Sequence, residues 1–201
     1  MCHLGIIGST RGTGMLALID AISKNKLHAS IDLVISNKPD SLILERARAH
    51  HLQAQYVDPK SCLSRDEYDA KISSLLRTHQ IDLIVLIGYM RILTNSFVSE
   101  WRNKIINVHP SLLPDFAGSM DEDVHRAVLD SGMKETGCTV HYVTEEVDGG
   151  PILIQKKCVV TSGDTYESLK TRVQLLEGEA LIDAINLLCA TKKTKDFYAT
   201  K

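Results

Sequence analysis

The sequence lacks the features that mark several common classes of protein. Its five cysteines are an odd number and include no CxxC pair, so neither a disulfide framework nor a zinc knuckle is expected. The formal net charge of −2 gives no electrostatic reason for general binding to nucleic acid or to a membrane surface. Apolar runs such as residues 81–87 are far too short to span a bilayer, and no signal peptide precedes the first strand-like run. These absences favour a cytoplasmic protein.

Strand-like apolar runs alternate with helical patterns over most of the 201 residues. Strands are expected at 4–7, 31–36, 55–57, 83–87 and 105–108, and helices at 15–23, 41–51 and 64–79, the last two with Ser41 and Ser64 as N-caps. This order predicts an α/β domain with a mostly parallel, Rossmann-like sheet and helices on both faces.

The later part of the chain changes character. Two strand-like runs at 139–143 and 152–160 are joined by a short loop, and they predict a mixed or antiparallel addition to the sheet. Residues 165–189 form one long helical pattern, or two patterns separated at Gly178. We place a single domain at 1–189 and a polar tail at 190–201.

The stretch GSTRGTG, at residues 8–14, joins the first strand to the first helix. Glycines let a ligand approach the backbone, and a helix N-terminus offers unpaired N–H groups and a positive dipole end, to which Arg11 and Thr13 add donors. The spacing is neither GxGxxG nor that of a P-loop, and Ser36 and Asn37 stand where a ribose-binding acid would follow the second strand. The loop therefore predicts a site for a single phosphate rather than a dinucleotide; a tight turn that binds nothing is the alternative.

Asn107 and His109 end the fifth strand-like run, and Pro110 and Pro114 follow. Side chains at i and i+2 of a strand point to the same side, and ligands of open α/β sheets bind beyond the carboxyl ends of the strands. The amide can donate to an oxyanion and the imidazole can move a proton near neutral pH, while the prolines restrict the backbone that leaves the strand. Asp148, beside a glycine pair, is the best candidate for a carboxylate that completes the set. The alternative is a structural histidine at a strand end.

Three further features have two readings each. His141 lies on the strand at 139–143, in a supporting role or as an ordinary hydrogen-bonded residue. His125 lies on a helical pattern, where a surface or supporting position is favoured. The stretch IGYMRIL, at residues 87–93, offers a wall for a flat heterocycle or ordinary core around a turn. No pair of histidines has the spacing of metal ligands, so we predict no metal.

The segments NVHPSLLP, GYMRIL and VDGGPILIQ follow in this order after a strand, a glycine loop and a helix. They resemble the folate-dependent formyltransferases over roughly residues 3–180. Within that family, the early stretch ISNKPDSLILERAR resembles the members that act in purine synthesis. The resemblance implies direct transfer of a formyl group from 10-formyltetrahydrofolate to the amine of glycinamide ribonucleotide, through a tetrahedral intermediate. We expect a monomer or a homodimer.

The resemblance also implies roles for individual residues. Asn107 would stabilise the oxyanion, His109 would act in acid–base transfer as an imidazolium, and Asp148 would position water or carry protons. The substrate phosphate and ribose would be bound by Arg11, Gly12, Thr13, Gly14 and Glu177. The folate would be bound by Tyr89, Met90, Arg91, Ile92, Leu93, Val143 and Val147, with Thr139 and His141 supporting Asp148.

The chain departs from the family pattern at four places. Gly14 stands where Asn is common, Ile87 replaces a small residue, and Gly178 stands where His is frequent. The segment 115–125 differs from the common form and is slightly longer. These departures bear on substrate details more than on the class of reaction.

Three other functions compete with this reading. A methionyl-tRNA formyltransferase usually adds a basic C-terminal domain, and a formyltetrahydrofolate hydrolase normally carries an N-terminal regulatory domain. A non-catalytic phosphate-binding module would keep the glycine loop but would not need Asn107, His109 and Asp148 together.

Overall fold

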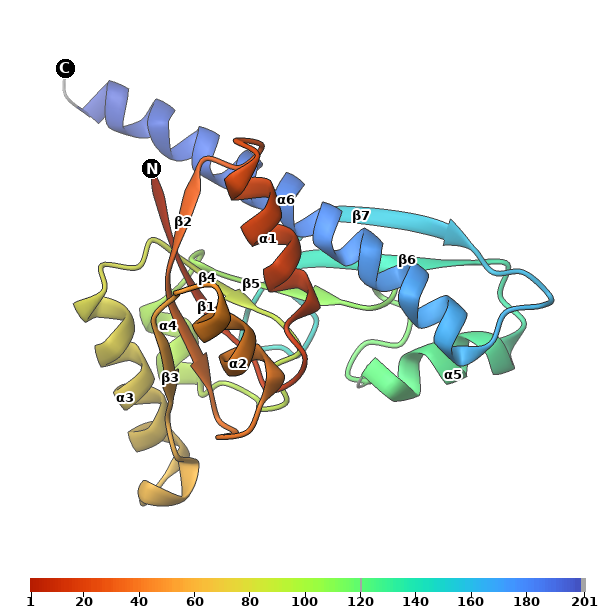
Figure 1. Cartoon of the computed structure of the whole chain (residues 1–201), viewed down its shortest axis with the longest axis horizontal. Helices are drawn as coiled ribbons and strands as arrows, with labels where there is room; N and C mark the ends of the chain where they lie inside the picture. Colours follow the sequence, from red (N-terminus) through yellow and green to blue (C-terminus); the bar gives the residue numbers. More distant parts are fainter. Residues whose placement is uncertain (120, 200–201) are drawn as a thin grey trace.

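The computed structural model describes residues 1–119 and 121–199, with side chains at 1–119 and 124–190. In the described part, one sheet has the strand order β3-β2-β1-β4-β5-β6-β7 (Figure 1). The strands are β1 Cys2–Ile7, β2 Ala29–Ser36, β3 Ala54–Tyr56, β4 Leu83–Leu86, β5 Ile105–His109, β6 Glu135–Tyr142 and β7 Ile152–Val159. The helices are α1 Thr13–Ser23, α2 Leu42–Ala49, α3 Arg65–Thr78, α4 Asn95–Glu100, α5 Asp121–Ser131 and α6 Tyr166–Ala199, with a 3-10 turn η1 at Pro59–Ser61. Within these ranges no helix is both long enough and apolar enough to cross a membrane.

The first five strands pair in parallel, whereas β6 and β7 pair antiparallel at one edge of the sheet. This confirms the predicted Rossmann-like sheet with an antiparallel C-terminal addition. β1 has β2 on one side and β4 on the other, so the order of the strands reverses there. Loops that leave the strands at such a reversal part from one another and open a crevice at the carboxyl ends.

Two apolar cores lie on the two faces of the sheet, as predicted. Helices α1, α2, α5 and α6 cover one face, where Leu4, Ile6 and Val85 are buried (Figure 1). Helices α3 and α4 cover the other face, where Ile7 and Ile105 are buried. Because alternate residues of a strand point to opposite faces, the odd-numbered residues of β5 point to the α3–α4 side.

The two predicted N-caps behave differently. Ser64 precedes α3, and its hydroxyl oxygen accepts a hydrogen bond from the Glu67 N–H at 3.1 Å, as expected for a capping box. Ser41 holds the N-cap position of α2 but makes no capping hydrogen bond. Its hydroxyl lies instead against the Ser36 hydroxyl and the Lys38 carbonyl. The competing partners at the end of β2 explain why the expected cap bond is absent.

Helix α6 passes Gly178 without a break and continues to Ala199. A Cβ atom at Gly178 would lie 2.6 Å from the Cβ atom of Ala17 in α1. The glycine therefore permits close approach of two helices rather than ending one, which decides between the two predicted readings. The helix also continues through most of the range expected to be a tail, and the domain limit at residue 189 stays a prediction.

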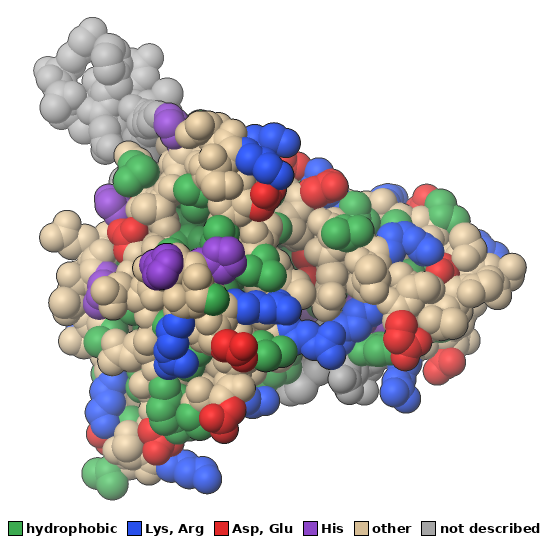
Figure 2. Space-filling model, in the orientation of Figure 1, with side chains coloured by type: hydrophobic (Ala, Val, Ile, Leu, Met, Phe, Trp, Pro, Cys, Tyr) green, Lys and Arg blue, Asp and Glu red, His purple; other side chains and the backbone are tan. Residues whose placement is uncertain are grey.

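Charged side chains of both signs lie interspersed on the face of the molecule seen in Figure 2. Lys and Arg side chains there have Asp and Glu side chains among them and do not form one large patch. The distribution on this face agrees with the small formal net charge of the sequence.

Candidate active site

Asn107 and His109 lie at the carboxyl end of β5, and the antiparallel pairing with β6 adds two more polar residues. His141 stands directly opposite Asn107, and Thr139 stands opposite His109. Residues directly opposite in an antiparallel pair share one face of the sheet. The side chain of His109 is buried, with 4% of the residue exposed, and Asn107 is half-buried. The strand thus brings an amide and an imidazole together, as the sequence predicted.

Asp148 reaches this cluster from the loop between β6 and β7. Its Oδ2 atom is 3.4 Å from Nδ1 of His109, and its Oδ1 atom is 3.5 Å from Nε2 of His141. The Gly118 N–H donates a hydrogen bond to Oδ2 at 2.9 Å. Asp148 has a φ of 54°, in the left-handed region, which aspartate tolerates better than most residues. A carboxylate from a distant segment therefore lies between two imidazoles.

Both ring nitrogens of His109 face oxygen acceptors. Nδ1 faces the Asp148 carboxylate, and Nε2 lies 3.2 Å from the Phe116 carbonyl oxygen. Burial lowers the pKa of His109, and the Asp148 charge and the Phe116 carbonyl offset only part of that shift. This direction favours the neutral ring before the reaction, and the imidazolium implied by the family resemblance stays a prediction. The physical reason is desolvation, and the two acceptors leave the ring ready to take up a proton.

The pKa of Asp148 shifts in the direction that keeps the group ionised. Burial alone would raise the pKa of Asp148, but the neighbouring His141 ring, the Gly118 N–H and the charge of His109 together lower it. The site therefore holds a partly buried carboxylate next to a histidine that can exchange protons. Such a pair is suited to acid–base chemistry.

His141 and Thr139, the two predicted supporting residues, act on different neighbours. The Nδ1 atom of His141 is 2.8 Å from the Tyr142 carbonyl oxygen, and its Nε2 atom is 3.2 Å from Nδ2 of Asn107. Nε2 of His141 thus lies against both the Asn107 amide and the Asp148 carboxylate, so the ring is a neighbour of both groups. The Thr139 hydroxyl donates to the Ser111 carbonyl at 2.7 Å, so it holds the segment that leaves β5. The expectation that Thr139 supports Asp148 stays a prediction.

Sequence reasoning did not find three groups at this site. The Phe116 carbonyl and the Gly118 N–H are backbone groups, which carry no residue-type signal. The Gln155 amide on β7 donates to the Thr139 hydroxyl and to the Leu113 carbonyl, each at 3.0 Å. The available signal for Gln155 was its place among the three consecutive polar residues 155–157 of the strand-like run 152–160.

The predicted phosphate loop leads directly into α1. Gly12 has a φ of 67° at the N-cap position, and no side chain caps the helix. The first-turn N–H groups at Thr13 and Gly14 are thus not taken by a capping side chain, and such a helix start favours an anion. Arg11 is exposed, and its carbonyl accepts from the Arg46 guanidinium at 2.8 Å. The arrangement supports a phosphate site whose donors are mainly backbone groups.

Close packing of α1 against α6 bears on two departures from the family pattern. A Cβ at Gly14 would lie 3.0 Å from Leu181 of α6, a tight contact, and 3.4 Å from Ile87 after β4, an ordinary one. Gly178, one turn before Leu181 on α6, also packs closely against α1, where a Cβ would lie 2.6 Å from the Cβ of Ala17. Helices α1 and α6 approach closely along this line, and Gly14 offers only its backbone to a ligand.

Ser9 links the phosphate loop to the predicted folate loop. Its N–H donates to the Gly88 carbonyl at 3.0 Å, and its hydroxyl accepts from the Met90 N–H at 2.9 Å. The same hydroxyl donates to the Asn37 side-chain carbonyl at 2.6 Å. Ser9 is almost fully buried, so the two loops at the reversal of strand order are held together by one side chain.

The predicted folate residues are only partly arranged as expected. Leu93 has 8% of its surface exposed and packs in the α3–α4 core, and its predicted contact with a folate stays a prediction. Ile92 is 64% exposed, Val147 is 49% exposed, and both side chains are available to a ligand. The Arg91 guanidinium lies 4.8 Å from the ring centroid of Tyr68.

Three other residues predicted to bind the folate or the ribose are half-buried. Tyr89 is half-buried, and burial raises the pKa of its phenol, so that this group stays protonated. Val143 is half-buried against the α3–α4 core. Glu177 is half-buried on α6, where burial together with the Glu177 charge raises the pKa of Cys138 to about 12. The predicted contact of Glu177 with a ribose stays a prediction.

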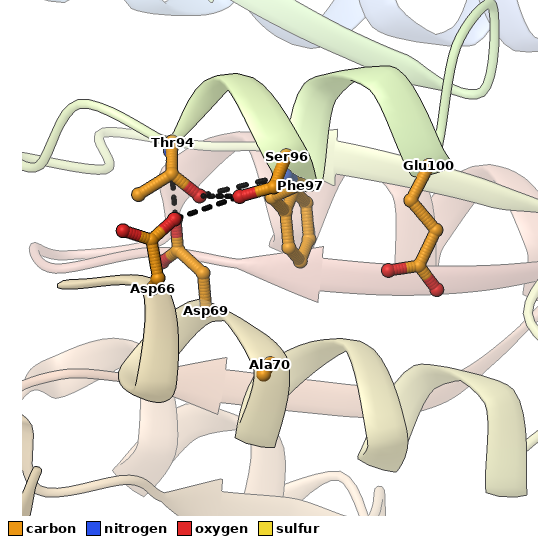
Figure 3. A pocket seen from close by; sticks show the side chains of 7 residues that line it. All are labelled: Asp66, Asp69, Ala70, Thr94, Ser96, Phe97 and Glu100. Atoms are coloured by element: carbon orange, nitrogen blue, oxygen red, sulfur yellow. Dashed lines mark hydrogen bonds between the residues drawn. The ribbon is translucent and has the colours of Figure 1, made fainter. Parts of the chain in front are cut away.

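A small pocket between α3 and α4 shares no lining residue with this cluster. Figure 3 shows Asp66 and Asp69 of α3 pointing to the start of α4. Their carboxylates accept hydrogen bonds from the Ser96 hydroxyl and the Thr94 N–H, both at 2.7 Å. The acidic groups therefore join two helices. In the described residues, no group of three or more His, Cys, Asp or Glu could hold a metal ion.

Comparison with known proteins identifies the class. A family model described as formyl transferase matches residues 3–185, so the chain belongs to the formyl transferase family. It is similar to phosphoribosylglycinamide formyltransferase of Escherichia coli (strain K12), with 38% identity over 175 residues that cover 87% of this chain and 81% of that protein.

Two further relatives extend the comparison. The crystal structure of glycinamide ribonucleotide transformylase 1 from Symbiobacterium toebii matches with a TM-score of 0.90 and 37% identity, covering 95% of this chain and 89% of that one. The trifunctional purine biosynthetic protein adenosine-3 of Gallus gallus is 40% identical over 187 residues, which cover 93% of this chain. The chain spans only 18% of the length of that relative.

Replacing Gly12 with valine is expected to lower the affinity for a ligand that carries a phosphate by about tenfold or more, since loss of one good anion contact has that size. A Cβ at this position would lie 2.5 Å from Ile43, and the φ of 67° disfavours a branched side chain. Isothermal titration of the purified variant measures the affinity. Gly132→Val is the matched control, because Gly132 has a φ of 68° with no atom within 4 Å of a Cβ. Undiminished affinity in Gly12→Val would remove the phosphate-loop assignment.

Replacing Ser9 with alanine is expected to raise KM for a substrate that binds the loop 88–93 and to lower stability by about 1–3 kcal/mol, because the Met90 N–H and the Asn37 carbonyl lose a buried partner. Steady-state kinetics and urea unfolding measure the two effects. Ser36→Ala is the control, since the Ser36 hydroxyl is equally buried but bonds Ser41 and Lys38. Equal kinetic effects of the two variants would contradict a link between the loops.

Proposed function

We propose that the chain transfers a formyl group from 10-formyltetrahydrofolate to the amine of glycinamide ribonucleotide, a step of purine synthesis. The observation that carries the proposal is the convergence of Asn107, His109 and Asp148, with the Asp148 carboxylate 3.4 Å from His109. A Formyl transferase family match and the similarity to phosphoribosylglycinamide formyltransferase of Escherichia coli support the choice of reaction.

The side chains present fit the demands of formyl transfer. Attack of an amine on a formyl carbon builds negative charge on the carbonyl oxygen and positive charge on the nitrogen, through a tetrahedral intermediate. A donor for the oxygen and a group that moves the proton are therefore needed. Asn107 supplies the amide donor, and its contact with His141 at 3.2 Å holds the amide in place.

His109 is the group that moves the proton. Its neutral form, favoured by burial, accepts a proton from the attacking amine, and the Asp148 carboxylate stabilises the imidazolium that results. The protonated ring can then give its proton to the departing nitrogen of the folate. In this sequence an imidazolium forms during the reaction rather than before it. The low pKa of Asp148 keeps the carboxylate charged throughout.

The two substrates would bind at two neighbouring loops, one after β1 and the other after β4. The phosphate of glycinamide ribonucleotide binds the N–H groups at the start of α1, with Arg11 beside it and Glu177 toward the ribose. The folate binds the loop 88–93 and the exposed Ile92 and Val147. Ser9 joins the two loops, and the formyl carbon and the amine would meet at the Asn107 and His109 side chains at the end of β5.

A single assay tests the proposal. The purified chain is mixed with 10-formyltetrahydrofolate and glycinamide ribonucleotide, and formylated product is measured by mass spectrometry. Methionyl-tRNA and water serve as competing acceptors in parallel reactions. We expect product only with glycinamide ribonucleotide; preferential formylation of methionyl-tRNA, or release of formate alone, would assign one of the competing functions instead. A cytoplasmic location and a monomeric or homodimeric state stay predictions, which fractionation and light scattering test.

A further inference from the structure

Cys62 and Lys71 form a close pair at the start of α3, away from the cluster at the end of β5. Cys62 follows η1, and Lys71 lies in the second turn of α3. The Nζ atom of Lys71 is 3.2 Å from the Sγ atom of Cys62. Nζ is also 3.3 Å from the Ser61 carbonyl oxygen and 3.1 Å from Oε1 of Glu67. Three acceptors therefore hold the amine against the sulfur.

The surroundings of Cys62 differ from those of three other cysteines. Cys2 and Cys138 are buried. Cys158 is half-buried and lies beside the Arg172 guanidinium, but burial still raises the pKa of its thiol. Reactivity of cysteine requires the thiolate, access to solvent and a nearby cation. Cys62 is half-buried and has the Lys71 amine in contact, so it combines access with a neighbouring cation.

We propose that Cys62 and Lys71 are the site of a reversible oxidative cross-link, formed with hydrogen peroxide as the oxidant. In the first step the Cys62 thiolate attacks one oxygen of the peroxide and the O–O bond breaks. The departing hydroxide takes a proton and becomes water, while sulfur loses two electrons and becomes a sulfenic acid. In the second step the neutral Lys71 amine attacks that sulfur, an S–N bond forms, and the S–O bond breaks. The leaving hydroxide takes an amine proton, so each cross-link consumes one peroxide and releases two waters.

The contact geometry favours both steps. A positive charge beside the sulfur stabilises the negative charge of the attacking thiolate. Contacts with Cys62 and Glu67 raise the pKa of Lys71, so the amine is an ammonium while the sulfur is reduced. Oxidation of the sulfur to a neutral sulfenic acid weakens the contact between Cys62 and the Lys71 ammonium. The ammonium therefore loses a proton more easily and becomes the neutral amine. The nitrogen is then already within reach of the sulfur, and a bimolecular capture becomes an intramolecular one.

The test treats the reduced, full chain with hydrogen peroxide and measures its intact mass. We expect a loss of two hydrogens relative to the reduced chain, and a tryptic map in which the peptides that contain Cys62 and Lys71 are joined. Dithiothreitol should restore the original mass. Cys158, which has a cation but no amine beside it, is the internal comparison within the same sample.

Three variants separate the roles of charge and nucleophile. Lys71→Arg keeps the positive charge, so Cys62 should oxidise at a similar rate, but the guanidinium should not form the S–N bond and dimedone should trap the sulfenic acid. Lys71→Met removes the positive charge beside the sulfur and should slow the oxidation of Cys62 by about tenfold, because the thiolate loses a stabilising cation. Cys62→Ser should show no loss of two hydrogens, and circular dichroism checks that each variant is folded.

Two results would overturn the proposal. One is oxidation of Cys62 in the unmodified chain to a sulfinic acid with no joined peptide. The other is a rate of oxidation at Cys62 no greater than that at Cys158. Neither result depends on formyl transfer, so the cross-link and the proposed enzymatic function stand or fall separately.

Discussion

Replacing His109 with alanine is expected to lower kcat by about 10³-fold, the usual contribution of a positioned acid–base group. The ring is the group at the end of β5 that can take a proton from the amine and return it to the departing nitrogen. Its Nδ1 atom lies 3.4 Å from Oδ2 of Asp148, whereas Oδ1 of the same carboxylate lies 3.5 Å from Nε2 of His141 on β6. Single-turnover kinetics, which isolate the chemical step from product release, measure the effect.

The variant must also be shown to fold. His109 is buried and its Nε2 atom lies against the Phe116 carbonyl, so the alanine variant leaves that acceptor unpaired at a cost of about 1–3 kcal/mol. His109→Gln is the matched variant, because its amide can still donate to the carbonyl but cannot exchange protons near neutral pH. We expect both variants to bind the two substrates and to be equally slow. Normal turnover in either one would make the acid–base assignment wrong.

Replacing Asp148 with asparagine is expected to lower kcat by about 10²–10³-fold and to change the pH–rate profile. The substitution removes the charge but keeps the shape, and asparagine accepts the φ of 54° found here. The Gly118 N–H can still donate to the side-chain oxygen. Any loss of activity therefore reports the charge rather than a collapse of the loop.

The direction of the pH effect follows from the charges. The Asp148 carboxylate raises the pKa of His109 and so offsets part of the lowering that burial causes. Without the carboxylate, the ring loses its proton at a lower pH, so the limb of the profile that reports His109 should move to lower pH. Asp115→Asn is the control, because Asp115 is exposed and carries the same charge on the segment that leaves β5. A profile with an unchanged limb would separate Asp148 from the titration of His109.

Most of the sheet could be predicted because its apolar pattern is strong. The continuous run at β4 and the alternation of strands with helices specify a parallel sheet, and the structure confirms it. Two elements were harder to find. β6 begins at Glu135, four residues before the expected start, because its first residues are paired with β7 rather than marked by apolar alternation. α4 is only 6 residues long, and it is held by the Thr94 cap, which local pattern does not reveal.

The candidate site was predictable where one strand presents it and less so where distant segments meet. The spacing of Asn107 and His109 alone places both on one face, whereas the approach of Asp148 needs the whole β6–β7 hairpin. The burial of Leu93 in the core could not be predicted, because an apolar residue after a strand serves a core or a ligand equally well. The direction of the pKa shift of His109 could not be predicted from the sequence either, since it depends on burial.

The pairing of β5 with β6 places His141 on the same face of the sheet as Asn107, and this depends on the number of residues in β6. Adding or deleting a single residue inside β6 would turn His141 to the opposite side of the sheet, into the core beneath α6, and would leave the amide of Asn107 without its orienting neighbour. A change of two residues would preserve the side but displace the ring by a full repeat of the strand. A one-residue change of length is therefore not tolerable within β6, and an engineered chain can be lengthened only outside that strand.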